Sequence, residues 1–349
     1  MLQPHFHRTS RSRAPHFAPL RFRAVALGAL LALTAVGCGG SDDTGGGKGE
    51  PSRIAFESCG ERLELDRAPQ RVAITTDAIA DTLFDLGVGK RIVAKTRGES
   101  APAPELRDRL ADLPSLGARN PSTEAMMAAK LDLLITDQVE KVSGKQGSPT
   151  VAELKRLGIA TYVVGGGCAK DLAADASGLE ALDGDLRQLG RIFDVEDRAK
   201  KVADQKREEL DDVRRRVAEQ PKRGVAKISR VAGQLYVTSG GLSNDVIERA
   251  GGKNLFAELP GQFAPISAEQ IVARNPHALI IDDFAASKAG HRESIEFLEK
   301  TFPTVDAVKE GRVLVLDAAK SGARGSTRPV EGVTETARFL HPSVFRAAR

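Results

Sequence analysis

The sequence has 349 residues, of which 51 are basic and 47 are acidic, so its formal net charge is +4. The first 37 residues hold five arginines and no acid, so residues 38–349 keep 46 of the 51 basic residues and all 47 acidic ones, a net charge of −1. Those 312 residues are enough for two lobes with separate cores, and their charge argues against a nucleic-acid partner.

The N-terminal segment has the pattern of an export signal. Arg21 and Arg23 precede the apolar run Ala24–Val36, which leads through a small residue to Cys38. A charged start, a short apolar core and a small-residue cleavage site are typical of secretory signals. Cys38 resembles the acceptor cysteine of a lipoprotein signal, with Ala35 where Leu is common. A transmembrane helix is the alternative, but the run is shorter than the roughly 18 residues that span a bilayer.

Lipid on Cys38 would anchor the protein outside the cytoplasmic membrane. Two acyl chains give stable anchoring where a single chain is marginal. We therefore predict a signal peptide over residues 1–37 and an extracytoplasmic, lipid-anchored location. Residues 38–52 contain Gly45–Gly47 and are expected to form a flexible tether.

Two further cysteines, Cys59 and Cys168, remain after lipidation of Cys38. In an exported protein they are expected to form one disulfide, with two free buried thiols as the alternative. No cluster of Cys or His surrounds them, so a metal site is not predicted.

Strands and helices alternate in the first half of the chain. The predicted strands are 71–75, 91–95, 131–136 and 161–164, and helices are predicted at 77–86 and 151–157. Residues 120–130 are predicted to form a loop and a helix, with Ser122 or Thr123 as possible N-caps. Asp77 can cap the first helix and Gly87 can end it. This order indicates a largely parallel sheet with helices on both of its faces.

A long amphipathic stretch begins near Val195. Apolar residues recur mostly at steps of three and four and so share one helical stripe. They are Val195, Ala199, Val202, Leu210, Val213 and Val217. About 25 residues of helix make a rod of roughly 37 Å, longer than one small lobe needs. The dense charges on the other face are interpreted as a solvated surface.

The alternation restarts after Pro221. Strands are predicted at 227–231, 234–238, 278–282 and 312–316, the first two as a hairpin, and helices at 244–250, 268–274, 293–300 and 330–339. The predicted fold class is α/β, with two Rossmann-like lobes joined by a single long helix and a ligand cleft between them. The boundaries are 53–193 for the N-terminal lobe, 194–220 for the helix and 221–349 for the C-terminal lobe.

Five stretches together resemble the periplasmic binding proteins of ABC importers for iron-siderophores and cobalamin, the class with a rigid helix between two lobes. They are 68–73 (APQRVA), 83–88 (LFDLGV), 129–135 (AKLDLLI), 250–256 (AGGKNLF) and 266–276 (ISAEQIVARNP). The order and spacing of these stretches carry the resemblance, which covers the chain from about Cys59 to its end.

The resemblance implies a partner and two docking residues. Glu124 and Glu269 match the family's pair of glutamates that meet arginines on a permease dimer, which works with an ATPase. An acid in the first turn of a helix is also favourable for capping and for the helix dipole alone, so capping is the alternative. We expect a monomer whose partners are this permease, its membrane anchor and its ligand.

Ligand contacts are expected from loops at the carboxyl ends of the strands, where the cleft of such folds lies. The predicted ligand-binding residues are Thr76, Arg97, Gln138, Ser239, Phe284, Arg324 and Arg328. An arginine fork pairs well with the carboxylate, catecholate or hydroxamate oxygens of an iron chelate.

The aromatic composition narrows the range of expected ligands. The chain has no Trp and only Tyr162 and Tyr236, with Phe263 and Phe284 as the other aromatic residues expected near the cleft. Receptors of this family hold cobalamin with aromatic rings. A ferric siderophore, an Fe(III) chelate, is therefore favoured over cobalamin or haem, and no cofactor of the protein's own is expected.

Three other classes are disfavoured or left open. A metal-ion receptor needs converging His and carboxylates, but only His277, His291 and His341 follow the signal. An enzyme is not predicted, because the G-x-S-x-G and G-x-G-x-x-G patterns are missing and adjacent Asp282–Asp283 should point to opposite sides of a strand. A receptor that signals to a membrane sensor cannot be told from a transport receptor by sequence.

Overall fold

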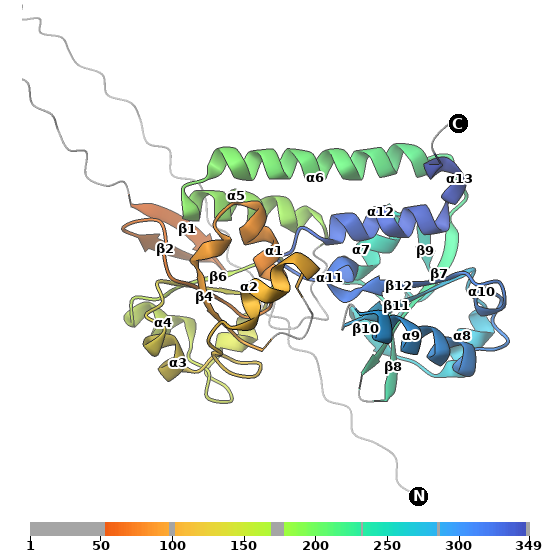
Figure 1. The fold of residues 1–349 in the computed structure, drawn as a ribbon, viewed down its shortest axis with the longest axis horizontal. Coiled ribbons are helices and arrows are strands. Elements are labelled where there is room, and N and C mark those ends of the chain that lie inside the picture. Colours follow the sequence, from red (N-terminus) through yellow and green to blue (C-terminus); the bar gives the residue numbers. More distant parts are fainter. Residues whose placement is uncertain (1–52, 98–101, 169–177, 232, 285–286, 347–349) are drawn as a thin grey trace, which may run out of the picture. The chain divides into compact units, whose positions relative to one another are not determined.

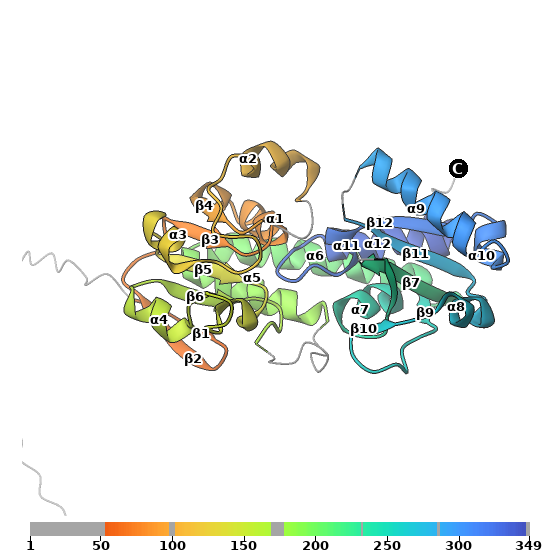
Figure 2. The same cartoon turned by 90° about the horizontal axis from the view of Figure 1, so that it is seen from below.

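The computed structural model describes five stretches of the chain: residues 53–97, 102–168, 178–231, 233–284 and 287–346. Residues 49–349 form one compact unit. Within it two α/β lobes lie side by side, and the long helix α6 (Glu196–Val217) runs along both (Figure 1). Seen from below, α6 passes behind the two lobes (Figure 2). The predicted fold class is confirmed. The predicted signal peptide, Cys38 and the tether lie outside the described residues.

The N-terminal lobe is built on a four-stranded parallel sheet with the order β4-β3-β5-β6. Its strands are β3 (Val72–Ile74), β4 (Ile92–Lys95), β5 (Leu133–Thr136) and β6 (Ala160–Val163). All residues of β3, β5 and β6 are buried, as expected for parallel strands covered on both faces. The connections contain α1 (Ala78–Asp85), η1 (Gly89–Arg91), η2 (Pro104–Leu106), α2 (Arg107–Ala111), α3 (Thr123–Ala128), η3 (Val139–Val142) and α4 (Val151–Arg156).

An antiparallel hairpin, β1 (Ile54–Ser58) and β2 (Glu61–Leu65), precedes this sheet and was not predicted. Its two-residue turn, Cys59–Gly60, has positive φ at both positions, the geometry of the tight turns that favour hairpins. A disulfide joins Cys59 to Cys168, which follows β6. The hairpin is thereby attached to the edge of the parallel sheet.

Two helices pack together along the long axis of the unit. Helix α5 (Glu180–Phe193), which was not predicted, runs beside α6 and ends at Asp194, a residue with positive φ. A side chain at Gly190 would come within 2.6 Å of the Ala199 Cβ, so the glycine allows the close approach. All six apolar residues of the predicted stripe on α6 lie in or against one hydrophobic cluster.

The C-terminal lobe is built on a mixed sheet with the order β10-β8-β7-β11-β12, with β9 also paired to β7. Strands β7 (Arg223–Val231) and β8 (Gln234–Thr238) form the predicted hairpin, and the others are β9 (Gly252–Asn254), β10 (Phe263–Pro265), β11 (Ala278–Asp283) and β12 (Val313–Asp317). Its helices are α7 (Gly241–Arg249), α8 (Ala268–Arg274), α9 (Lys288–Thr301), α10 (Asp306–Lys309), α11 (Ala318–Gly322), α12 (Pro329–Leu340) and α13 (Pro342–Phe345).

The lobes are connected by more than the long helix. The segment between α11 and α12 reaches α1 of the N-terminal lobe, where Thr82 Oγ1 donates to the Gly325 carbonyl over 2.7 Å. Thr327 Oγ1 donates to Asp85 Oδ2 over 2.6 Å. A side chain at Gly325 would come within 2.5 Å of Val164, so this crossing fits closely. These contacts should limit how far the lobes can separate.

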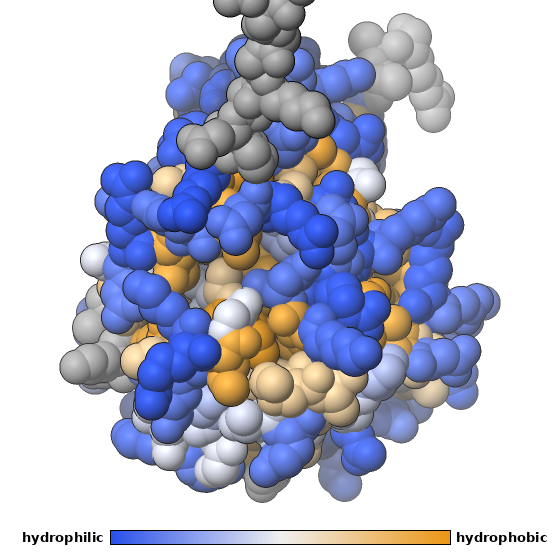
Figure 3. Space-filling model, turned by 90° about the vertical axis from the view of Figure 1, so that its left-hand side faces the viewer, coloured by the Kyte–Doolittle hydropathy of each residue, from blue (hydrophilic) through white to orange (hydrophobic). Residues whose placement is uncertain are grey.

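The outer end of the N-terminal lobe has a mixed surface. Hydrophilic side chains cover most of it, and hydrophobic ones show in its middle (Figure 3). Exposed apolar side chains are common on protein surfaces when they occur singly. Within the described stretches, no helix is both long enough and apolar enough to cross a membrane.

Candidate ligand-binding cleft

A cavity of about 430 Å³ lies between the two lobes. The N-terminal lobe contributes the start of α1 and the loop after β5, including Thr76 and Gln138. The C-terminal lobe contributes the ends of β7 and β11 and the segment from α11 to Arg324. These are carboxyl ends of parallel strands, the place where open α/β folds bind ligands.

The C-terminal wall of the cleft is apolar. Val231, Phe263 and Phe284 line it with between 45 and 54% of their surface exposed, and Tyr236 lies beside them. Large exposed hydrophobic side chains that share one cavity mark a binding surface more strongly than scattered ones do. Three aromatic side chains therefore line this cavity, although the chain has no Trp and only two Tyr.

Each lobe places a Lys–Asp pair with a buried lysine at the cleft. In the N-terminal lobe Lys141 Nζ lies 2.8 Å from Asp137 Oδ1, which also accepts a hydrogen bond from Thr75. In the C-terminal lobe Lys227 Nζ lies 2.7 Å from Asp282 Oδ2. Each pair neutralises its own charge inside one lobe, so neither gives the cleft a net charge.

In the C-terminal pair, one carboxylate oxygen of Asp282 has no hydrogen-bond partner among the described residues. Ser229 Oγ donates over 2.8 Å to Oδ2, the oxygen that Lys227 also contacts. The other oxygen is Oδ1, and it is buried. Asp282 also lines the cavity, so this oxygen lies in the wall of the cleft. Neither pair was predicted from the sequence. The available signal for the C-terminal pair was Lys227 inside a predicted apolar strand, with Asp282 at the end of another; Lys141 lies outside the predicted strands and helices.

The predicted ligand-binding residues fall into two groups. Thr76, Gln138, Phe284 and Arg324 line the cavity, where Arg324 Nη2 also donates to Gln262 Oε1 over 3.0 Å. Arg97, Ser239 and Arg328 lie outside it.

Local structure explains the second group. Arg97 is exposed, and its main-chain N–H is bound to the Gly117 carbonyl. The Ser239 hydroxyl is buried and donates to the Gly261 carbonyl over 2.9 Å. The Arg328 guanidinium is buried and pairs with Asp317 over 2.6 Å. Their loops are close to strand ends, as predicted, but the side chains point elsewhere.

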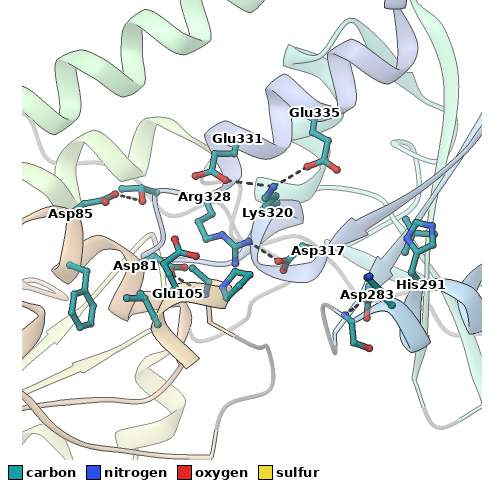
Figure 4. Close-up of a pocket in the computed structure, with 18 residues that line it drawn as sticks. Asp81, Asp85, Glu105, Asp283, His291, Asp317, Lys320, Arg328, Glu331 and Glu335 are labelled. Atoms are coloured by element: carbon teal, nitrogen blue, oxygen red, sulfur yellow. Dashed lines mark hydrogen bonds and ion pairs between the residues drawn. The ribbon is translucent and has the colours of Figure 1, made fainter. Parts of the chain in front are cut away.

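A second interlobe cavity, of about 810 Å³, is strongly charged (Figure 4). Its charged side chains largely bind one another: Arg328 pairs with Asp317, and Lys320 lies 3.1 Å from Glu335 and 3.6 Å from Glu331. Burial raises the pKa of Asp81 to about 7, although the charge of Arg328 opposes the shift. The smaller cavity is the candidate ligand-binding cleft, because it exposes apolar side chains at the strand ends.

The predicted docking glutamates are exposed on two capped helices. Ser122 and Ser267 cap α3 and α8, and Glu124 and Glu269 occupy the second helical position of each. Hydrogen bonds from its own main chain and from Ser267 lower the pKa of Glu269, so this side chain is ionised at neutral pH.

A metal centre is not visible in the described stretches, where no three His, Cys, Asp or Glu side chains are placed to hold an ion. His341 is buried against the Gly251 carbonyl, and His291 lines the charged cavity. Asp282 and Asp283 point to different cavities, and Asp283 Oδ2 accepts a hydrogen bond from the Ser287 N–H.

Two lobes with a cleft at their strand ends and a helix along both define a solute receptor. The family model described as "Periplasmic binding protein" matches residues 72–319, and the chain belongs to that family. It is an extracytoplasmic substrate-binding protein of the kind that serves ABC importers, and members of this family are binding proteins rather than enzymes.

Three similar proteins have names that state different ligands. A vitamin B12-binding protein of Yersinia pestis is 24% identical over 219 residues, which is 62% of this chain and 70% of that one. The structure of an ABC-type Fe3+-hydroxamate transport system from Saccharomonospora viridis has a TM-score of 0.66 at 20% identity, covering 82% of this chain and 99% of that one. The structure of a periplasmic haem-binding protein from Pseudomonas aeruginosa has a TM-score of 0.63 at 25% identity, covering 79% of this chain and 94% of that one.

Proposed function

We propose that this chain is a lipid-anchored receptor that captures a ferric siderophore and delivers it to the permease dimer of an ABC importer. The observation that supports this ligand class is a cleft that combines an apolar wall with the guanidinium of Arg324. The wall suits the carbon framework of a chelator, and an arginine fork suits its metal-binding oxygens. The anchor is proposed on Cys38, from the sequence pattern around it.

The proposed mechanism requires binding and docking but no covalent chemistry. The ligand enters the cleft, and the lobes close modestly because α6 and the contacts of residues 325–327 with α1 restrict their movement. The loaded receptor then docks on the permease through Glu124 and Glu269. Two separated charges mainly fix the orientation of a complex and speed its formation.

Haem is the second candidate, and Tyr236 is the observation that favours it. Its side chain lines the cleft next to Phe263 and Phe284. A phenol oxygen can serve as an axial ligand of haem iron, and flat aromatic side chains can contact a porphyrin face. Absorption spectra distinguish the candidates: a haem complex that depends on the phenol should lose its Soret shift in Tyr236→Phe, whereas siderophore binding should not.

Replacing both cleft phenylalanines should weaken ligand binding by about 30-fold. Phe263→Ala with Phe284→Ala removes two half-exposed rings, each of which contributes about 1 kcal/mol when a ligand covers it. Calorimetric titration with a ferric trihydroxamate, a ferric tricatecholate, haem and cyanocobalamin would measure the change and identify the ligand. Leu157→Ala, an equally exposed apolar residue away from the cleft, is the control. Unchanged affinity in the double variant would reject this cleft.

Replacing both docking glutamates should reduce uptake by at least about tenfold while leaving ligand affinity unchanged. Glu124→Ala with Glu269→Ala removes one negative charge from each lobe, and neither residue lines the cleft. Uptake of labelled ligand in cells and calorimetry on the purified protein separate the two effects. A fall in ligand affinity would instead assign the glutamates to the cleft or to the fold.

A further inference from the structure

Helices α3 and α8 repeat one local pattern, once in each lobe. In both, a serine caps the helix: Ser122 Oγ accepts from the Ala125 N–H and Ser267 Oγ accepts from the Gln270 N–H. Both helices are followed by a residue with positive φ, Lys130 in one lobe and Asn275 in the other. The following strand, β5 or β11, begins at the same distance from the capping serine in the two lobes.

The repeat extends to the exposed side chains. Three residues after each glutamate lies an apolar residue that is open to solvent: Met127 is 48% exposed and Val272 is 37% exposed. Side chains three positions apart share one helix face, so each apolar residue lies beside its glutamate. The preceding residues, Met126 and Ile271, are fully buried. Each helix therefore packs into the core through the buried residue. Core packing does not explain why the next residue is also apolar.

The two helices also occupy matching places in the fold. They lie at the lower ends of the two lobes, on the side away from α6 (Figure 1). The view from below shows both of them, one in each lobe (Figure 2). Six large hydrophobic side chains are exposed in the described stretches, and three of these line the ligand cleft. Of the other three, two are Met127 and Val272 on these helices.

We propose that Glu124 with Met127, and Glu269 with Val272, form two equivalent docking patches for a membrane permease with two like halves. Each half would present a basic side chain next to an apolar one. The charges orient the complex, and the apolar side chains supply affinity that the charges alone do not. This inference rests on the proposed receptor function and adds a contact to it. The repeated pattern favours a partner with twofold symmetry, because two equal patches fit two equal surfaces.

The test replaces apolar surface without changing shape or charge. Met127→Gln keeps side-chain length and helix propensity, and Val272→Thr keeps the branched shape. Binding of each purified variant to the permease–ATPase complex in lipid nanodiscs is measured by biolayer interferometry. The double variant should bind about 5- to 30-fold more weakly. The control Leu157→Gln changes a similarly exposed apolar residue on neither helix and should bind within about twofold of the wild type.

Salt separates the two kinds of contact. Raising NaCl to about 0.5 M should shrink the effect of Glu124→Ala with Glu269→Ala, because exposed charges are screened, whereas the loss caused by Met127→Gln with Val272→Thr should persist. If the glutamate variant docks like the wild type, the docking role itself fails. If it docks weakly while the apolar variant matches Leu157→Gln, only the apolar contact is overturned. Sedimentation that shows a wild-type dimer abolished by the apolar variant would assign the patches to a second copy and also overturn the proposal.

Discussion

Lys227→Ala is expected to lower the free energy of unfolding by about 3–5 kcal/mol. The Lys227 and Asp282 side chains are only 1% and 5% exposed, and their charged atoms lie 2.7 Å apart. Removing the ammonium leaves the Asp282 carboxylate buried beside a single hydroxyl donor, Ser229. Breaking a buried pair is costly because the remaining charge has lost its compensation. Urea unfolding followed by circular dichroism measures the change.

Two further variants show whether the lone charge is the cause. Lys227→Met with Asp282→Leu removes both charges and should recover most of the stability, since a buried pair and an apolar pair of similar size are often close in energy. Lys222→Ala breaks an exposed pair with Glu248, whose atoms also lie 2.7 Å apart, and should cost less than about 1 kcal/mol. If Lys227→Ala costs no more than Lys222→Ala, solvent in the cleft stabilises the lone Asp282.

Removing the disulfide should cost about 4 kcal/mol of stability. Cys59 and Cys168 are 109 residues apart, and the chain-entropy model gives roughly 4–5 kcal/mol for a closed loop of that length. Cys59→Ser with Cys168→Ser, measured by scanning calorimetry, should therefore melt well below the wild type. The wild type treated with a reductant should melt at the same temperature as the double variant. Equal melting of reduced and oxidised wild type would show that the bond does not constrain the unfolded chain.

The disulfide also bears on the cleft. Cys168 lies in the segment that follows β6, where the Gly167 carbonyl accepts a hydrogen bond from the Val139 N–H over 2.9 Å. A side chain at Gly167 would come within 2.1 Å of the Asp137 carbonyl, so the loop packs tightly on the segment that carries Asp137 and Gln138. We therefore expect the cysteine variant to bind ligand more weakly as well as to unfold more easily.

Much of the fold was predictable because its signals are local. The apolar runs of β5 and β6 and the stripe on α6 are periodic over short stretches, and they predicted parallel strands and a long helix. The hairpin β1–β2 was missed although its Cys59–Gly60 turn was a usable signal. Helix α5 was missed although its apolar residues recur at helical spacing.

The candidate site was predictable only in part. Loops at strand ends were expected to line the cleft, and Thr76, Gln138, Phe284 and Arg324 do so. Which arginine reaches the cavity was not predictable, because a loop's position does not fix the direction of its side chains. The Arg328 side chain pairs with Asp317 outside the cavity, and the Arg97 side chain is exposed on the surface.

By itself, the sequence determined the fold class, the family and a glutamate in the first turn of each of two capped helices, because helix caps and hydrophobic periods are properties of neighbouring residues. The tertiary structure alone decided which distant residues meet. Lys227 reaches Asp282 because β7 pairs with β11. The apolar wall forms because residues from β7 and β10 converge with Phe284, which follows β11. Only the structure shows that Met127 and Val272 occupy equivalent exposed positions, each directly after a buried residue of its helix. Such contacts depend on strand order and burial, which short-range patterns do not encode.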